Sequence, residues 1–434
     1  MRRRSFWCLP RWLVLHWAAV CRPQRQRPFQ LGLLQRQPKA GHLPRRLCRL
    51  ARQPPTRPAP TPSPTRTATP TRVISTSPVT LPAPLYLIDS NTKQIVRLDA
   101  DGKTVIPITS EVKPVTDFDV SPPDGSLVYV SDNDLILADA MGRNRKILVN
   151  GDSLTLKELQ ENWWTRVIDA PRWSPDGKQI AFGLGGINLI APTGGKPQLI
   201  QPNDPNDFDP VKSGGARRFR PVSWSPDGTR LLLQFSWYIE AGGHAVKNLG
   251  DGRLVELEST SGLYYTPFWN MKGTQVYRCD MATGLAGYCE DKTGEGLYAF
   301  DAGTGQKRPL IVGVGGKCTI VKSFYQAKDG QLFMFMAFAT TTELFSQSVT
   351  PRPLIRFGMY RAAPDATNRT ELRSDIYNVW DALWSPDAVG SAIISGKTSW
   401  WDGEDENTVM WVPIDSTKPP VLLPVNGGTL RWGK

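Results

Sequence analysis

Short apolar segments recur along residues 84–434, and each of them follows a cluster of turn-forming residues. The segments 179–183, 230–234 and 391–395 are rich in Ile, Leu, Ala and Phe and have the length of a β-strand. Short strands separated by Gly, Pro, Asp and Ser are typical of all-β proteins. The pattern therefore predicts an all-β fold built from repeated hairpins.

The turn before each of these apolar segments has a repeated sequence. Residues 173–177 read Trp-Ser-Pro-Asp-Gly, residues 224–228 read the same, and residues 384–387 keep Trp-Ser-Pro-Asp. Pro presets φ at the second position of a type I turn, and Gly supplies the left-handed residue that closes it. The large apolar side chain of the Trp suits packing between neighbouring sheets. We therefore expect each repeat to be a hairpin within a larger sheet.

Weaker copies of the turn lie between the strong ones, at residues 120–125, 269–273 and 325–330, and each is followed by an apolar strand. The six copies begin 45 to 59 residues apart. A four-stranded propeller blade needs roughly 40–45 residues, so each repeat fits one blade with an inserted loop.

The two ends of the repeat region supply the parts of one more blade. Residues 429–433 resemble the first strand of a repeat, whereas residues 85–88, 94–98 and 104–108 are three strands without a leading one. One C-terminal strand that joins three N-terminal strands closes the ring and removes its open edges. We predict a β-propeller of seven blades closed in this way, with six blades as the alternative.

The Trp-Ser-Pro-Asp-Gly repeats, each followed by an apolar strand, resemble the WD-like repeats of the TolB-type β-propellers. The resemblance covers residues 84–434, and the fourth and fifth copies depart from it because they lack Ser-Pro. It implies a bacterial domain outside the cytoplasm that binds other envelope proteins and works as a monomer.

Two further segments precede this domain. Residues 54–83 are rich in Pro and Thr, which favours an extended linker. Residues 1–53 begin with three Arg and contain a nine-residue apolar run, 12–20, which is too short to span a bilayer and is typical of an export signal. Cys21, directly after that run, is a candidate lipidation site of a lipoprotein. The alternative is that residues 1–53 come from a mis-assigned start.

The net charge of +12 arises in the N-terminal segments. Residues 1–88 contain 16 Lys and Arg and no Asp or Glu, so the propeller region itself is slightly acidic. The basic pI is therefore no indication of nucleic-acid binding, and we expect no nucleic-acid partner. Membrane contact is expected only through an N-terminal anchor.

Candidate binding residues are aromatic pairs and one histidine. The pairs, which could stack on sugar rings, anchor a protein partner or simply pack in the core, are Trp163 and Trp164, Trp237 and Tyr238, and Trp400 and Trp401. His244 follows two glycines, and we expect it in a glycine-rich loop that faces either a ligand or solvent.

Cys279 and Cys289 flank a glycine-rich segment and either form a disulfide or remain thiols. No cofactor is expected, although two acid-rich segments offer the oxygen ligands that Ca²⁺ prefers or are simply solvated. These candidate calcium ligands are Asp204, Asp207 and Asp209 in one segment and Asp402, Glu404 and Asp405 in the other. No other metal site is indicated.

The sequence contains no Gly-x-Ser-x-Gly elbow and no complete P-loop, and we assign no catalytic residue. The first hypothesis is therefore a non-enzymatic binding module, periplasmic or on the cell surface, that mediates protein–protein interaction at the cell envelope. The alternative is a propeller that binds or cleaves carbohydrate. A third interpretation is a cytoplasmic repeat protein.

Overall fold

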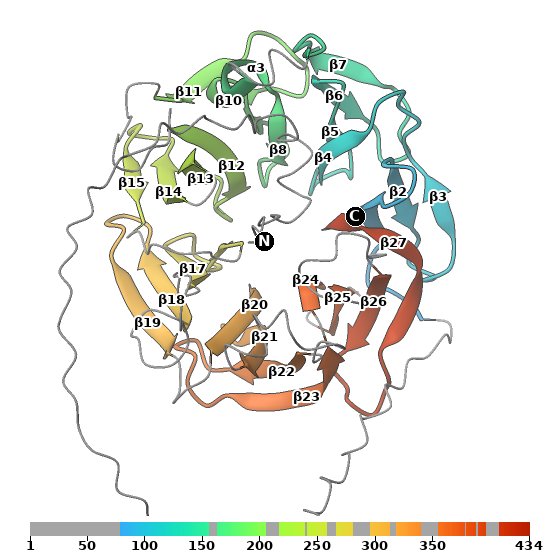
Figure 1. The fold of residues 1–434 in the computed structure, drawn as a ribbon, viewed down its shortest axis with the longest axis vertical. Helices are drawn as coiled ribbons and strands as arrows, with labels where there is room; N and C mark the ends of the chain where they lie inside the picture. The colour runs from blue at the N-terminus through green and yellow to red at the C-terminus, as the bar shows by residue number, and fades with distance from the viewer. Residues whose placement is uncertain are drawn as a thin grey trace, which may run out of the picture. The chain divides into compact units, whose positions relative to one another are not determined.

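The computed structural model describes residues 79–155, 163–204, 217–238, 241–257, 266–280, 296–312, 318–339, 355–377, 379–387, 389–395 and 408–434. Within these residues the chain is almost entirely β-strand, and sheets follow one another around a common centre (Figure 1). Their one helix is α3 (Trp163–Arg166). The all-β propeller predicted from the sequence is confirmed. None of the described helical segments is long and apolar enough to cross a bilayer.

Five sheets each contain four antiparallel strands in chain order. The first three contain β4 (Val115–Val120), β5 (Leu127–Ser131), β6 (Asp134–Ala138) and β7 (Lys146–Val149); β8 (Asp169–Trp173), β9 (Ile180–Gly183), β10 (Gly186–Ile190) and β11 (Gln198–Pro202); and β12 (Arg218–Trp224), β13 (Arg230–Tyr238), β14 (Ala241–Asn248) and β15 (Leu254–Glu256). The other two contain β16 (Phe268–Trp269), β17 (Gln275–Asp280), β18 (Gly296–Asp301) and β19 (Lys307–Val312); and β20 (Cys318–Gln326), β21 (Leu332–Ala339), β22 (Arg356–Ala362) and β23 (Thr370–Tyr377). The first strands β4, β8, β12 and β20 lie nearest the centre of the ring (Figure 1).

The sixth sheet joins the two ends of the propeller. Its seven strands, in spatial order, are β24 (Val379–Trp384), β25 (Gly390–Ser395), β26 (Thr408–Pro413), β27 (Val421–Trp432), β1 (Leu85–Asp89), β2 (Ile95–Leu98) and β3 (Val105–Pro107). The first half of β27 pairs with β26, and its second half pairs with β1, where Trp432 lies opposite Leu85. The predicted closure by one C-terminal and three N-terminal strands is therefore present. Dividing this sheet at β27 corresponds to seven blades, and that count remains our interpretation.

The repeated turn is held by the hydrogen bonds that its sequence predicts. The Ser174 hydroxyl donates to Asp176 Oδ1 (2.7 Å) and accepts from the Gln179 backbone N–H (2.9 Å). Gly177 has φ = 70°, the left-handed region that favours glycine. In the fourth copy Asn270 replaces Ser, and its side-chain oxygen accepts from the backbone N–H of Gln275 (3.0 Å). The fourth copy, which lacks Ser-Pro, therefore keeps the same turn by different chemistry.

The Trp of each strong repeat lies between neighbouring sheets, as the sequence predicts. Trp173 is buried with residues of β5 and β6, and Trp224 is buried with residues of β9 and β10. The Trp224 indole N–H also donates to the Arg172 backbone oxygen on the inner strand of the preceding sheet (3.0 Å). Trp384 makes the same kind of bond to the Ser323 oxygen, at 3.2 Å. These bonds fix the inner strands of successive sheets against each other.

The two ends of the sheets carry different connections. At one end, which we call the turn face, the inner strand of each sheet turns into the second strand through residues 121–126, 174–179, 225–229, 270–274, 327–331 and 385–389. Neighbouring turns touch: a Cβ on Gly177 would lie 2.9 Å from Pro123 Cγ, and the Tyr325 hydroxyl donates to the Pro386 oxygen (3.0 Å). The turn face is therefore a continuous ring of short, packed turns.

Because the strands are antiparallel, the connections from the third to the fourth strand of each sheet also lie at the turn face. The connections from the second to the third strand, and from each sheet to the next, lie at the opposite end, which we call the loop face. The long connections of the chain are all of this kind, and they are 150–168, 203–217, 257–267, 281–295, 340–355 and 396–407. On the turn face no connection is longer than 139–145, which joins β6 to β7. The insertions that lengthen the repeats are thus confined to one face.

Candidate functional site

Two of the three aromatic pairs predicted from the sequence lie in described elements, at their loop-face ends. Trp163 and Trp164 begin α3, in the connection from β7 to β8, and Trp237 with Tyr238 ends β13. Trp400 and Trp401 are outside the described residues, in the sequence that joins β25 to β26. The backbone topology therefore brings the two described pairs to one face, and the role of all three pairs in binding remains a prediction.

His244 is not in a loop, so that prediction is wrong. It lies in the middle of β14, paired with Gln234 of β13, and is only 3% exposed. The two glycines before it belong to the strand, because a Cβ on Gly243 would lie 2.6 Å from the Phe235 ring. Burial, and then the charge of Arg278, lower the pKa of His244 well below its usual value. His244 is therefore a neutral interior side chain near physiological pH.

The other candidates are mostly untested. The Cys279 thiol is buried and accepts a hydrogen bond from the Val321 backbone N–H (3.4 Å), whereas Cys289 is outside the described residues. Asp204 forms a backbone bridge with Arg217. The other candidate calcium ligands, Asp207, Asp209, Asp402, Glu404 and Asp405, and Cys21 lie outside the described residues. The described part of the chain contains no cluster of three or more metal-ligating side chains.

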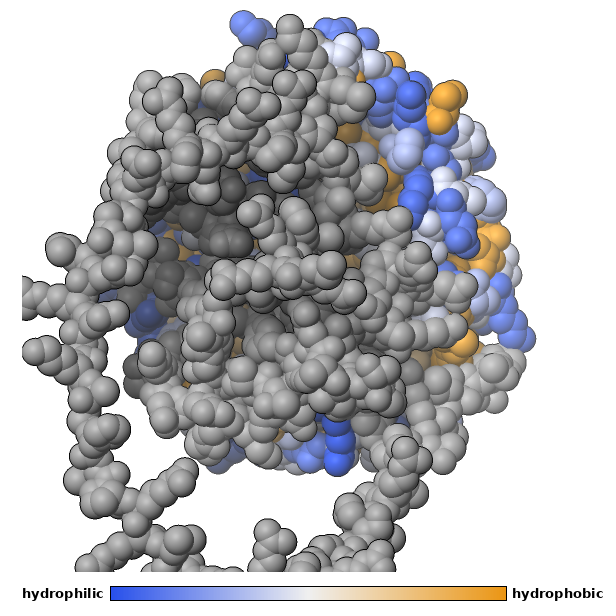
Figure 2. Space-filling model, in the orientation of Figure 1, coloured by the Kyte–Doolittle hydropathy of each residue, from blue (hydrophilic) through white to orange (hydrophobic). Residues whose placement is uncertain are grey.

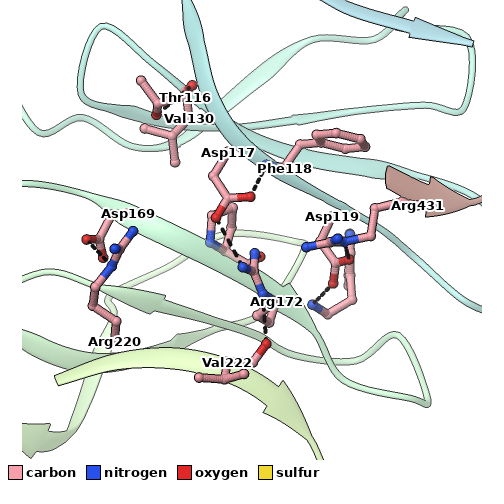
Figure 3. A network of polar contacts seen from close by, with 12 residues as sticks. Thr116, Asp117, Phe118, Asp119, Val130, Asp169, Arg172, Arg220, Val222 and Arg431 are labelled. Atoms are coloured by element: carbon pink, nitrogen blue, oxygen red, sulfur yellow. Dashed lines mark hydrogen bonds and ion pairs between the residues drawn. The ribbon is translucent and has the colours of Figure 1, made fainter. Parts of the chain in front are cut away.

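A chain of ion pairs links four successive inner strands around the centre of the ring (Figure 3). Arg431 of β27 binds Asp119 of β4 at 3.0 Å, and Arg172 of β8 binds Asp117 of β4 at 3.1 Å. Asp169 of β8 binds Arg220 of β12 at 2.8 Å. Each pair therefore joins one sheet to the next.

The middle pair of this chain is the most buried. Burial alone would raise the pKa of Asp117, but the charges of Arg172, Arg431 and Arg220 outweigh it and hold the pKa below its usual value. Arg172 also donates through Nε to the Val222 oxygen of β12 (2.9 Å) and through Nη1 to the Pro171 oxygen (2.6 Å). Arg172 is thus fixed on three sides and works as a structural tie between sheets.

The last ion pair, Asp169 with Arg220, lines a pocket at the loop face. This loop-face pocket is a small recess that opens to solvent and lies between the β8–β11 sheet and the β12–β15 sheet. Its lining residues are Val167, Asp169, Gly183, Leu184, Gly185, Gly186, Asn203, Arg218, Phe219, Arg220 and Ser236. Arg220 is 51% exposed there, whereas Asp169 is 22% exposed. The pocket therefore offers an accessible guanidinium backed by a half-buried carboxylate.

Glycines form one wall of the loop-face pocket. A Cβ on Gly183 would lie 2.1 Å from Asp169 Oδ1, and Gly186 has φ = 138°. Both positions therefore require glycine, which lets the Asp169 carboxylate lie directly against the backbone of β9.

Sequence reasoning missed Asp169, Arg218 and Arg220. The ion-pair chain did leave a signal, because Asp119, Arg172 and Arg431 all stand directly before the last residue of an inner strand. That position alternates in sign over three successive inner strands, from Arg431 to Asp119 to Arg172, and is uncharged in the next one, where Ser223 occupies it.

The described surface over the outer strands β3 and β7 shows no comparable site. Over the outer strands β3 and β7, hydrophilic residues predominate and hydrophobic residues are interspersed among them (Figure 2). Two of the exposed hydrophobic side chains are Val105 and Ile147, at 39% and 40% exposure. Isolated apolar side chains of this kind are ordinary protein surface.

Sheets of four antiparallel strands around a centre, closed by pairing of the two ends, define this chain as a β-propeller. No protein-family model matches the sequence, and no curated protein matches it. The solved structure of oligogalacturonate lyase from Vibrio parahaemolyticus is similar over 80% of this chain and 86% of its own, with a TM-score of 0.50 and 11% identity.

TolB proteins are also among the structural neighbours. A protein assigned as TolB from Agrobacterium tumefaciens is similar over 70% of this chain and 90% of its own (13% identity, TM-score 0.39). TolB from Acinetobacter baumannii is similar over 66% of this chain and 62% of its own (16% identity, TM-score 0.38). At such low identities the comparisons show the propeller fold and leave the activity of this chain open.

Proposed function

We propose that this chain is a TolB-like, non-enzymatic binding propeller that acts outside the cytoplasm and holds an envelope or surface protein on its loop face. The observation that carries the proposal is the difference between the two faces. The long connections start and end at the loop face, where the backbone of Trp163–Trp164 and Trp237–Tyr238 also lies, whereas the turn face consists of short turns. Variable loops on a rigid scaffold are the usual location of a binding site.

The N-terminal sequence supports the location. The basic start and apolar run of residues 1–53, with Cys21 as a lipid attachment point, are typical of export, and the Pro/Thr-rich residues 54–83 suit a spacer between an anchor and a domain.

Site-specific photocrosslinking in cells of the source organism tests the proposal. A photoreactive amino acid is placed at Val112 and Asp132, which are exposed on the loop face, and, as matched controls, at Lys178 and Lys272, which are exposed on the turn face. We expect one adduct of defined mass from the loop-face positions only, in the exported fraction. Adducts from the turn face alone, or none from either face, would refute it.

Carbohydrate binding is the second candidate, because the backbone of two aromatic pairs, Trp163–Trp164 and Trp237–Tyr238, lies on one face, and aromatic rings suit stacking against sugars. Binding of a neutral oligosaccharide that is lost when Trp237 and Tyr238 are replaced by Ala, with no protein adduct from Val112 or Asp132, would favour this candidate over the first.

A further inference from the structure

We propose that Asn133 is a positioning residue of the loop face: it fixes both ends of the 150–168 connection and thereby presents α3 (Trp163–Arg166) to the partner protein. This inference rests on the proposed function, because it names the part of the loop face that the partner touches. The structure describes the connection at residues 150–155 and 163–168.

Asn133 lies in the two-residue turn between β5 and β6, where Ser131 pairs with Asp134. Asp132 and Asn133 have φ of 48° and 65°, the left-handed values of a type I′ turn. Asn and Asp adopt these values more readily than other residues that carry a side chain. A regular hairpin of the sheet therefore sets the position of the Asn133 side chain.

The Asn133 side chain bonds to both ends of the connection. Its Nδ2 lies within 3.0 Å of three backbone oxygens, those of Gly151, Asp152 and Arg166. Its Oδ1 accepts from the Ile168 backbone N–H at 2.7 Å, and Ile168 is buried. One amide group thus closes the two ends of a long loop on each other, as in Ω-loops, which are frequently functional.

Glycines permit the close approach on both sides of the connection. A Cβ on Gly151 would lie 2.5 Å from Asn133 Nδ2, so a larger residue there would displace the amide. A Cβ on Gly185, in the turn from β9 to β10, would lie 3.3 Å from the Thr165 oxygen. The backbone of α3 is therefore held against turns of two neighbouring sheets.

An exposed ion pair adds little to these bonds. Arg166 Nη2 lies 3.8 Å from Asp152 Oδ2, and the two side chains are 42% and 78% exposed, so solvent screens their attraction. The bonds of Asn133 to Gly151, Arg166 and Ile168 are partly buried and directional. We therefore assign the position of α3 to Asn133 rather than to the ion pair.

A fixed α3 suits a binding contact. It contains Trp163 and Trp164, and Arg166 at its end is bonded to Asn133. Trp is enriched among the residues that carry most of the binding energy of protein interfaces. A segment that is already ordered also loses less conformational entropy when a partner binds.

Photocrosslinking in cells from Thr165, an exposed residue of α3, tests the inference on the full-length protein. Asn133→Asp keeps the left-handed turn and the acceptor for Ile168, but directs a carboxylate oxygen at three backbone oxygens. We expect the adduct yield from Thr165 to fall about fivefold, the equivalent of one lost hydrogen bond, and the yield from Val112 to change less than about twofold.

The matched control is Asn144→Asp on the turn face. Asn144 also has a left-handed φ, 57°, and its Nδ2 donates to Asp139 Oδ2 at 3.0 Å. We expect this variant to change neither adduct yield by more than about twofold. Asn133→Gly keeps the turn and removes all the side-chain bonds, so it should reproduce the effect of Asn133→Asp.

An unchanged ratio of Thr165 to Val112 adducts in both Asn133 variants would overturn the inference. An equal fall at both positions would do so as well, because Asn133 would then support the whole fold instead of placing α3. Adducts of the wild-type protein from Val112 with none from Thr165 refute the inference and leave the proposed function intact. Absence of adducts from Thr165, Val112 and Asp132 alike refutes the proposed function itself.

Discussion

The turn face and the loop face of this propeller are built from the same strands and have opposite character. On the turn face, each connection closes on itself through Ser, Asp and Gly and packs against the next, as Gly177 does against Pro123. On the loop face, long insertions follow strand ends, and the ion-pair chain finishes in an open pocket at Arg220. The packed turns therefore restrain the strands at one end, whereas the other end accommodates insertions of variable length.

The closure of the ring is the strongest test of where stability lies. Deletion of residues 427–434 removes the half of β27 that pairs with β1, and leaves the half that pairs with β26. We expect the cooperative thermal transition to be lost, because β1 then becomes an unpaired inner edge. Calorimetry measures it, with deletion of Lys434 alone as the control. A transition within about 2 °C of wild type would contradict the role of β27.

The two ends of the ion-pair chain should differ in energy. Asp117→Asn leaves the buried Arg172 without its counter-charge, and we expect it to lower the free energy of unfolding by about 3 kcal/mol. Asp169→Asn disturbs a pair whose Arg220 is 51% exposed, and should cost less than about 1 kcal/mol. Urea denaturation of both variants measures the difference. Equal losses would show that the loop-face end is as integral to the fold as the centre.

Between the two faces, buried His244 should make the free energy of unfolding depend on pH. Its folded pKa lies well below 6.5, so the unfolded state takes up a proton first as the pH falls. Stability is therefore complete above pH 6.5 and declines as the pH falls from there towards the folded pKa, by about 1.4 kcal/mol per pH unit. His244→Gln should remove this decline. Urea titrations at pH 7.5 and 5.5 measure it, and identical pH dependence in both proteins would contradict the assignment.

The smallest expected effect distinguishes packed turns from open ones within the turn face. Gly177 and Gly252 have similar φ, 70° and 71°, so replacement of either by Ala costs about 1 kcal/mol of backbone strain. Only Gly177→Ala also brings a Cβ to 2.9 Å from Pro123, whereas a Cβ on Gly252 meets nothing within 4 Å. We expect Gly177→Ala to cost about 1 kcal/mol more in urea denaturation. Equal costs would mean that the ring of turns is not tightly packed.

The fold was largely predictable from the sequence because its signals are local. Ser174, Asp176 and Gly177 make their defining hydrogen bonds within a single short turn, so the sequence of that turn predicts its structure. The closure was predictable because Trp432 stands in the same register as the Trp of the other repeats.

The site was not predictable in the same way. Asp169 and Arg220 meet only because β8 and β12 are adjacent in the ring, about fifty residues apart in sequence. His244 was misassigned to a loop because two consecutive glycines are also typical of turns. Here Gly243 instead accommodates the Phe235 ring within the sheet. Contacts between sheets depend on how strands that are far apart in the sequence are aligned, and this alignment cannot be derived from a single sequence.

The way in which β27 closes the ring also has a mechanical consequence. The chain enters the propeller at Leu81, whose N–H donates to the Ala100 oxygen in the connection from β2 to β3, at the turn face. A pull on the preceding chain, resisted by a partner on the loop face, would run along β1. Since β1 is hydrogen-bonded to β2 on one side and to β27 on the other, that load is shared by two ladders in shear rather than opening one bond at a time. β27, the strand that closes the ring, would thus also help β1 to resist a force applied through the N-terminal linker.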